Sequence, residues 1–371
     1  MRVGYDAKRI FHNSSGLGNY SRDLVRILAS RYLEHSFHLY NPKNSKHNLW
    51  KALPNTTTHS PKGIWKWLHS IWRQGPISSQ LKKDKIELYH GLSGELPKEL
   101  NIPSIVTVHD LIFYRYPELY NTIDVFIHKR KIRHAVKKAT QVVAISEQTK
   151  ADLVDYIGIP DSKIKVIYQG CHPIFKTKLT KNVLKKITEK YNLPEKYVLF
   201  VGTLEERKNA LFIAEALEKT SHNLVFVGKI KSHGEKLKSF VKSKGIGHRV
   251  LFIQNISIED LAAVYQNATV FCYPSFFEGF GIPIIEALYS GIPVITTKGG
   301  CFAEAGGPSS IYVNPKDKLA LQNAVQVLFS ESKHERELRI EQGYSYVQQF
   351  NDEVIAEKWN SCYKSVLQKQ F

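Results

Sequence analysis

A strand, a glycine-bearing loop and a helix follow one another between residues 270 and 288. Residues 270–273 form a short apolar run that predicts a buried strand. The loop and helix after it read Pro274-Ser275-Phe276-Phe277-Glu278-Gly279-Phe280-Gly281-Ile282-Pro283-Ile284-Ile285-Glu286-Ala287-Leu288. Gly279 and Gly281 let the backbone approach a ligand closely, and the N-terminus of a helix that starts near Gly281 favours a phosphate. This unit predicts a parallel α/β sheet with an anion-binding corner.

The same alternation of strand and amphipathic helix runs along almost the whole chain, which is typical of parallel sheets with crossover helices. The chain has 371 residues, which is more than most single domains contain. We therefore predict two α/β domains, each with its own sheet. Predicted strands fall in the first half at residues 2–6, 37–40, 87–90, 105–109, 142–145 and 165–168, and in the second half at residues 197–201, 224–227, 250–253, 270–273, 293–296 and 311–313.

The junction between the two domains is predicted between residues 168 and 197. This stretch passes through Gly170 and Pro173 and closes with Asn192-Leu193-Pro194 before a new strand begins. The predicted domains are residues 1–175 and residues 176–351. Residues 352–367 predict a final helix with Asn351 or Asp352 as its N-cap, and its apolar stripe must dock on another element.

Two pairs of charged residues lie beside predicted strand ends. Glu278 and Glu286 are eight residues apart, so one flanks the loop and the other lies about one turn inside the helix. Arg207 and Lys208 follow a glycine turn at Gly202, and adjacent cations of this kind neutralise a diphosphate without a metal. The two pairs predict cations, a helix dipole and hydroxyl acceptors at one sheet edge. Taken singly, each pair has an alternative interpretation as solvated surface charge.

The N-terminal half carries weaker signals. Gly16 and Gly18 precede a predicted helix, but the gap after the strand at residues 2–6 is too long for a dinucleotide-binding fingerprint. His109 ends the predicted strand at residues 105–109, which places it at a sheet edge with Asp110 beside it. A purely structural histidine is the alternative to a catalytic one.

The formal net charge of +18 predicts an anionic partner. Residues 1–175 carry 26 Lys and Arg against 14 Asp and Glu. Within them, residues 123–139 predict a basic amphipathic helix, and residues 62–73 contain three tryptophans flanked by cations, typical of a helix at an anionic membrane surface. A core helix with a basic polar face is the alternative. Neither run has a nucleic-acid-binding motif, so we expect no nucleic acid partner.

The expected location of the protein rests on two sequence features that we do not find, an apolar leader and a membrane-spanning run. No apolar leader follows the N-terminus, and no run approaches the roughly 20 apolar residues of a membrane span. The four cysteines are scattered without the spacing of a zinc site or a disulfide framework. We expect a cytoplasmic protein without a metal site, peripheral on the inner face of the membrane.

Several segments match one known family in order and spacing. They are Gly16-Leu17-Gly18, Val108-His109-Asp110, Ala144-Ile145-Ser146, Val201-Gly202-Thr203 with Arg207-Lys208-Asn209, the segment from Glu278 to Glu286, and Ser290-Gly291-Ile292-Pro293-Val294-Ile295 with Asn314-Pro315-x-Asp317. Through them the chain resembles the retaining glycosyltransferases of family four over nearly its whole length. The resemblance implies the GT-B fold, two facing Rossmann-like doubly wound domains with a C-terminal helix, here residues 352–371, that crosses back to the N-terminal domain.

The resemblance also implies roles for residues of the C-terminal domain. Arg207 and Lys208 resemble the pair that binds the donor diphosphate and stabilises it as the leaving group. Glu286 resembles the ribose contact, and Glu278 the glutamate that meets the hydroxyls of the donor sugar. The remaining donor-binding positions that the resemblance implies are Gly202, Gly279, Phe280, Gly281 and Ile282.

Residues of the N-terminal domain complete the implied site. His109 resembles a histidine near the transferred sugar, and Gly16 and Gly18 resemble a loop that closes over the phosphates. The stretch from His109 to Glu118 is most similar to mannosyltransferases that use GDP-mannose. The chain departs from the family at Gln254-Asn255 and in the turn before Glu304, so neither indicates the donor.

The activity implied is retaining, metal-independent transfer of a sugar, with mannose from GDP-mannose as the best match. The acceptor is expected to be a glycan carried on a lipid, in cell-surface polysaccharide or lipopolysaccharide biosynthesis, and no cofactor is expected besides the nucleotide-sugar substrate. Three alternatives stay open: a UDP-sugar donor, an epimerase or phosphorylase of the same fold, and a basic scaffold or nucleic-acid-binding protein without turnover.

Overall fold

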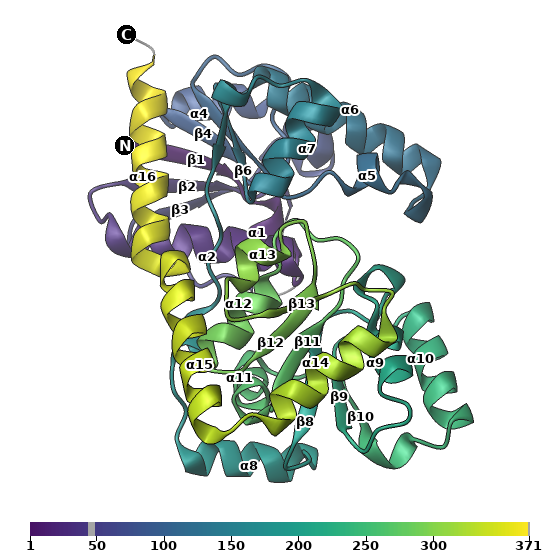
Figure 1. Ribbon diagram of the computed structural model, residues 1–371. Coiled ribbons are helices and arrows are strands. Elements are labelled where there is room, and N and C mark those ends of the chain that lie inside the picture. Colours follow the sequence, from purple (N-terminus) through teal and green to yellow (C-terminus); the bar gives the residue numbers. More distant parts are fainter. Residues whose placement is uncertain (44–48, 370–371) are drawn as a thin grey trace. The chain divides into compact units, whose positions relative to one another are not determined.

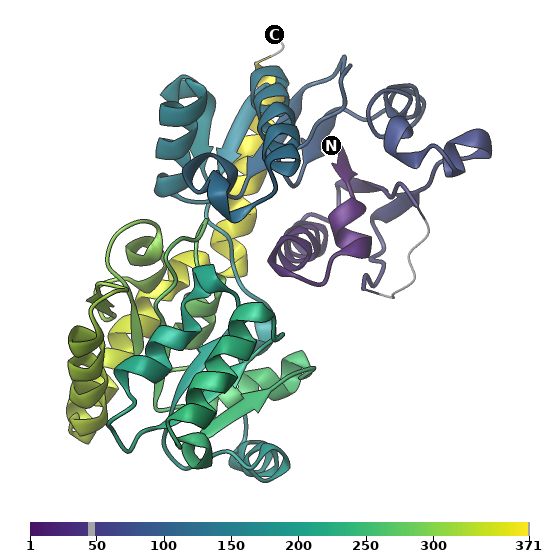
Figure 2. The same ribbon diagram turned by 90° about the vertical axis from the view of Figure 1, so that its right-hand side faces the viewer.

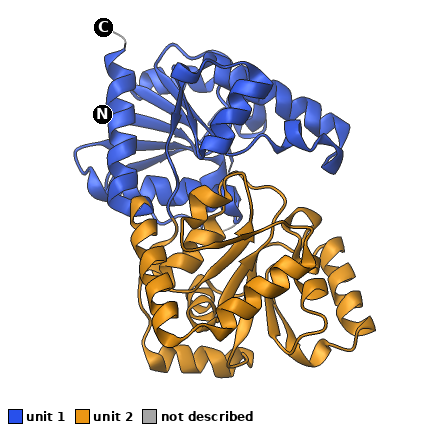
Figure 3. Cartoon of the chain, viewed as in Figure 1, with its two compact units in different colours: residues 1–170, 350–371 blue, residues 171–349 orange. Residues whose placement is uncertain are grey.

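The computed structural model describes residues 1–43 and 49–369. Contacts among residues divide the chain into two compact units, coloured separately in Figure 3: unit 1 is residues 1–170 with residues 350–371, and unit 2 is residues 171–349. Each unit is built on one parallel sheet. The predicted fold class, α/β with two parallel sheets, is therefore confirmed.

In its described residues, unit 1 holds a seven-stranded sheet with the strand order β3-β2-β1-β4-β5-β6-β7, and every pair is parallel. All residues of the central strands β4, β5 and β6 are buried, polar ones included, because both faces of a parallel sheet are covered. The strands are β1 (Arg2–Asp6), β2 (Ser36–Tyr40), β3 (Thr56–His59), β4 (Leu88–Gly91), β5 (Ser104–Val108), β6 (Gln141–Ala144) and β7 (Ile164–Val166).

Helices cover both faces of this sheet (Figures 1 and 2). One core cluster contains Tyr5 of β1, Leu24 and Trp359, and a second contains Val106 of β5 and Val136. The helices are α1 (Lys8–His12), α2 (Gly16–Arg31), α3 (His69–Trp72), α4 (Ile77–Lys83), α5 (Ile112–Arg115), α6 (Thr122–Lys138), α7 (Glu147–Ile157) and α16 (Asp352–Gln368), with 3-10 turns η1 (Gly63–Lys66), η2 (Pro117–Leu119) and η3 (Asp161–Lys163).

The predicted terminal helix is α16, and it packs within unit 1. The side chain of Asn351 caps it by accepting a hydrogen bond from Val354 N at 2.9 Å. An ion pair of 2.8 Å between Arg26 of α2 and Asp352 joins the two helices, which lie side by side. Its apolar stripe is buried through Ile355, Ala356, Trp359, Cys362, Tyr363 and Val366.

Unit 2 contains a six-stranded parallel sheet with the order β10-β9-β8-β11-β12-β13. Its strands are β8 (Tyr197–Val201), β9 (Asn223–Val227), β10 (Val250–Ile253), β11 (Val270–Tyr273), β12 (Val294–Thr297) and β13 (Ile311–Val313). The helices are α8 (Lys181–Tyr191), α9 (Ala210–Ala216), α10 (Ser232–Ser243), α11 (Ile258–Asn267), α12 (Ile282–Tyr289), α13 (Phe302–Gly306), α14 (Lys318–Ser330) and α15 (Lys333–Val347), with 3-10 turns η4 (Pro173–Lys176), η5 (Glu206–Lys208), η6 (Gly247–Arg249) and η7 (Gln348–Phe350), whose last residue belongs to unit 1.

The strand β3 was not predicted. Its sequence, Thr56-Thr57-Thr58-His59, is polar and partly exposed, and the strand lies at the edge of the sheet. It forms because the edge of β2 offers backbone partners, with Phe37 opposite Thr56 and Tyr40 opposite His59.

The prediction of one amphipathic helix at residues 62–73 was wrong. The segment divides into η1 and α3, and Leu68 between them has non-helical dihedral angles. Trp72 is buried at 4% exposure, whereas Trp67 is 86% exposed. Arg73, predicted as a flanking cation, instead forms largely buried ion pairs with Asp6 and Glu95.

The helix predicted at residues 123–139 is present as α6, and few of its residues are in the core. Val125, Ala135 and Val136 are buried, while Ile123 and Phe126 are more than 60% exposed. Among the described residues, we find no helix with the length and apolar character that crossing a membrane requires.

Candidate active site

The carboxyl ends of β8 and β11 carry the loops that contain the predicted donor-binding cations and Glu278. The two strands are neighbours in the sheet, so their loops meet. Phe276 N donates a hydrogen bond to Arg207 O at 2.9 Å, and Asn209 Nδ2 donates to Pro274 O at 3.2 Å. These bonds fix one loop against the other.

Glu278 is the centre of a largely buried ion cluster, in which its own side chain is 12% exposed and those of Lys208 and Arg207 are 14% and 19% exposed. Its Oε1 lies 2.7 Å from Lys208 Nζ and 2.9 Å from Arg207 Nη1. The same oxygen accepts hydrogen bonds of 2.9 Å from Tyr273 OH and from Ser275 Oγ. Burial by itself would raise the pKa of Glu278, but the charges of Lys208 and Arg207 lower it to about 2. Three of the predicted site residues are thus brought together, with the carboxylate ionised.

A second carboxylate extends this cluster. Glu205 Oε1 accepts from Arg207 Nη2 at 2.9 Å, and Glu205 Oε2 lies 2.9 Å from Lys231 Nζ. Burial lowers the pKa of Lys208, although the Glu278 charge opposes that effect. The cluster therefore combines three cations with two carboxylates and keeps a surplus of positive charge that suits an anionic ligand.

Tyr273, Glu205 and Lys231 were not among the predicted site residues. Glu205 lies two positions before Arg207. This closeness of an acidic residue to Arg207 and Lys208 was the one sequence signal that could have identified Glu205 as a site residue. Lys231 follows β9 and reaches the site because Leu204 and Ile230 form a parallel bridge between their loops. In the sequence, Tyr273 was interpreted only as part of the buried strand at residues 270–273.

The glycines place the start of α12 beside Glu278. Gly281 is the N-cap of α12, with φ +114°, and a Cβ there would lie 3.1 Å from Ile284 Cδ1. Gly202, at the end of β8, has φ +151°. Gly279 and Phe280 complete the loop, and Ile282 is the first residue of the helix. The predicted anion-binding corner thus has a helix N-terminus whose dipole favours negative charge.

Glu286 lies one turn inside α12. Its Oε2 accepts a hydrogen bond of 3.0 Å from Tyr265 OH of α11. Burial raises the pKa of Glu286 to about 7, and the Tyr265 hydroxyl opposes that rise. No hydrogen bond or ion pair joins Glu286 to the cluster around Glu278 among the residues that the structure describes, so the two carboxylates occupy separate environments.

The predicted residues His109, Gly16 and Gly18 belong to unit 1. His109 follows β5, and its Nε2 donates to Leu92 O at 2.8 Å. Burial lowers the pKa of His109 to about 4, so the imidazole is neutral near pH 7 and Nδ1 carries no proton. Gly16 and Gly18 begin α2, and a Cβ at Gly18 would lie 1.8 Å from the carbonyl oxygen of Asn13.

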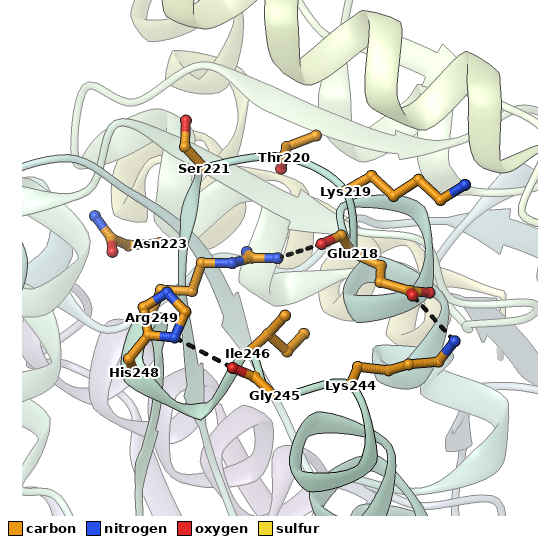
Figure 4. Close-up of a pocket in the computed structure, with 10 residues that line it drawn as sticks. All are labelled: Glu218, Lys219, Thr220, Ser221, Asn223, Lys244, Gly245, Ile246, His248 and Arg249. Atoms are coloured by element: carbon orange, nitrogen blue, oxygen red, sulfur yellow. Dashed lines mark hydrogen bonds and ion pairs between the residues drawn. The ribbon is translucent and has the colours of Figure 1, made fainter.

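A hollow of about 480 Å³ in unit 2 is shown in Figure 4 with its lining residues. It lies at the amino ends of β9 and β10, whereas Glu278 follows the carboxyl end of β11. Arg249 stands among its lining residues, and its guanidinium donates to the carbonyl oxygens of Leu217, Glu218 and His222 at 2.6–2.9 Å. These bonds satisfy backbone groups after α9. We therefore assign Arg249 to the fold of unit 2.

Comparison with known proteins supports one family over both units. Residues 14–173 match the model described as "Glycosyltransferase Family 4", and residues 184–345 match "Glycosyl transferases group 1". The O-antigen chain mannosyltransferase B of Escherichia coli is 25% identical over 388 residues, covering 98% of this chain and 97% of that protein.

Solved structures show the same fold. Sucrose-phosphate synthase from Thermosynechococcus elongatus has a TM-score of 0.82 at 22% identity and covers all of both chains. HepE from Anabaena, solved in complex with UDP and glucose, has a TM-score of 0.75 at 16% identity, covering 98% of this chain and 99% of that one. With both family models matched and the two parallel sheets in place, the chain belongs to the family-four glycosyltransferases of the GT-B fold.

Proposed function

We propose that this protein is a retaining glycosyltransferase that moves mannose from GDP-mannose to a glycan acceptor. The observation that carries the proposal is the buried cluster of Arg207, Lys208 and Glu278 beside the N-terminus of α12. During sugar transfer, negative charge collects on the departing diphosphate while the sugar becomes oxocarbenium-like. Fixed cations and a helix dipole aimed at that diphosphate lower the barrier because they bind the transition state more strongly than the substrate.

Each member of the cluster has a distinct part in this proposal. Arg207 and Lys208 neutralise the leaving diphosphate in place of a metal ion. Glu278 uses Oε1 for its four contacts, and Oε2 makes no hydrogen bond with the described residues. That second oxygen is the acceptor for a hydroxyl of the donor sugar. In the same scheme, the neutral His109 of unit 1 is assigned to the transferred sugar. Gly16 and Gly18, which lie in the first turn of α2 and not in a loop, are assigned to the phosphates.

The mannose donor is supported by the E. coli relative, whose name specifies a mannosyltransferase. A UDP-sugar is the second candidate, favoured by the UDP bound in HepE. The test is to measure binding of GDP-, UDP-, ADP- and dTDP-sugars and then to determine the anomeric configuration of the product with and without EDTA. Binding only of uridine nucleotides would reject GDP-mannose, and an inverted product would reject retention.

The acceptor in this proposal is a lipid-linked glycan of O-antigen type, reached by a protein peripheral on the inner membrane face. A cavity of about 730 Å³ in unit 1 supports this view, because its wall places apolar Leu96, Phe126 and Ile127 beside the cation Arg130. Lys131 also lines the cavity and is paired with Glu95 at 3.2 Å. Such a wall suits an apolar chain that carries phosphate. Vesicles containing anionic lipid should retain the protein at low salt, and Phe126→Ser should reduce retention. Equal retention of both proteins would contradict the membrane proposal.

Glu286 gives the proposal a pH dependence. As the ribose contact, its carboxylate accepts hydroxyl hydrogen bonds, and only the ionised form has both oxygens free to accept. Because burial raises the pKa of Glu286 to about 7, nucleoside diphosphate affinity should fall by up to about tenfold as the pH drops from 8 to 6.

Calorimetric titration at several pH values checks this dependence, with Glu286→Gln and a 2′,3′-dideoxy nucleotide as controls. Both controls should lose the dependence. A dideoxy nucleotide whose affinity changes with pH as much as that of the ribose form would assign the effect to another group.

A further inference from the structure

Tyr273 contributes a buried hydroxyl group to the ion cluster around Glu278, and the proposed mechanism does not use it. It is the last residue of β11, and its side chain is inaccessible to solvent. Its oxygen contacts Lys208 Nζ and lies 2.9 Å from Glu278 Oε1. The hydroxyl therefore touches both the cation and the carboxylate assigned to the donor.

The direction of these two hydrogen bonds is determined by the partners. An ammonium group only donates, so the Tyr273 oxygen accepts from Lys208 and its own proton goes to Glu278. Burial raises the pKa of Tyr273 well above its usual value, and the adjacent Glu278 charge adds to the rise. The phenol consequently keeps the proton that it donates.

The tyrosine ring has little freedom to move. It stacks on Phe200 with centroids 5.9 Å apart and on Phe271 with centroids 5.8 Å apart. The backbone oxygen of Tyr273 accepts from Thr296 Oγ1 at 2.8 Å. The hydroxyl thus has a fixed position set by three neighbouring strands.

The fixed hydroxyl of Tyr273 restricts the position of the Lys208 ammonium group. Among the described residues, the ammonium has two polar partners, Tyr273 OH and Glu278 Oε1, and it also lies 5.0 Å from the Tyr273 ring centroid. Since an ammonium has three N–H groups, these two contacts leave one donor with a defined direction. A preorganised donor of this kind stabilises an anion more than a mobile one does.

We propose that Tyr273 is a positioning residue that orients Lys208 and Glu278 for the diphosphate group of the donor. This inference rests on the proposed function, and it adds a residue outside the set that the family motif indicated. Tyr273→Phe removes one oxygen atom and keeps the stacked ring. We expect it to weaken nucleoside diphosphate binding by about tenfold, because a hydrogen bond to a charged group is lost.

The experiment compares GDP and UDP with GMP and UMP by calorimetric titration of the full-length protein. The monophosphates lack the second phosphate, so Tyr273→Phe should leave their affinity unchanged while it lowers that of the matching diphosphate. Tyr197→Phe is the control, because it also removes a buried hydroxyl in unit 2, one that donates to Val264 O at 2.6 Å away from the cluster. It should change neither affinity.

A double-mutant cycle with Lys208→Ala tests whether Tyr273 acts through Lys208. In that background, Tyr273→Phe should produce no further loss of diphosphate affinity. Additive losses, equal losses for mono- and diphosphates, or a wild-type affinity in Tyr273→Phe would each overturn the role of Tyr273 while leaving the proposed function intact. A wild-type protein that binds none of the four nucleotides would overturn both.

Discussion

Replacement of Lys208 by alanine should lower kcat/KM for sugar transfer by about 100- to 1,000-fold, the size seen when one fixed donor is removed from a site of developing negative charge. The Lys208 side chain is 14% exposed, and its ammonium lies 2.7 Å from Glu278 Oε1. In the proposed mechanism, the alanine variant would have only Arg207 to neutralise the departing diphosphate. Steady-state kinetics with the donor that the binding screen selects will measure the effect.

The matched control for this substitution is Lys231→Ala. Lys231 belongs to the same cluster but contacts Glu205, is 54% exposed, and forms no ion pair with Glu278 among the described residues. Its replacement should change kcat/KM by less than about threefold, as expected for an exposed pair. Thermal unfolding of both variants separates loss of activity from loss of fold. Similar rates for Lys208→Ala and Lys231→Ala would reject Lys208 as the cation of the leaving group.

Replacement of Trp359 by alanine should destabilise unit 1 by about 3–5 kcal/mol, the range for removing a large aromatic side chain from a core. Trp359 is fully buried on α16, with its ring 4.7 Å from His90 and 5.6 Å from Tyr363. Alanine would leave a cavity between α16 and His90 of β4. Denaturant unfolding followed by circular dichroism gives the change in free energy.

Trp67→Ala is the control, because it removes a tryptophan side chain that is not part of the core. Its side chain is 86% exposed, so the substitution should alter stability by less than about 0.5 kcal/mol. Nucleotide affinity offers a second readout, because the charged side chains proposed to bind the nucleotide, those of Arg207, Lys208 and Glu286, lie in unit 2. If Trp359→Ala and Trp67→Ala unfold at the same denaturant concentration, the packing of Trp359 on α16 does not contribute to the stability of unit 1.

The sequence predicted most of the fold because each strand and helix has its own periodicity. Continuous apolar runs such as β8 and β11 indicate strands buried on both faces, and the predicted bounds of these two strands agree with the structure. The stripe of α16 and the cap at Asn351 were likewise local signals. Prediction was wrong at residues 62–73, where the burial of Trp72 and the ion pairs of Arg73 depend on partners far away in the chain.

The residues of the candidate site also divide into those that the sequence indicated and those that only the tertiary structure revealed. Residue type and spacing made Arg207, Lys208 and Glu278 candidates, with solvated surface charge as the alternative, and the family resemblance supplied their roles. Only the pairing of β8 with β11 placed these three side chains within hydrogen-bonding distance. The same strand pairing places the Tyr273 hydroxyl between the charges of Lys208 and Glu278. No local sequence pattern specifies the strand order of a sheet, and it is this order that decides which loops meet.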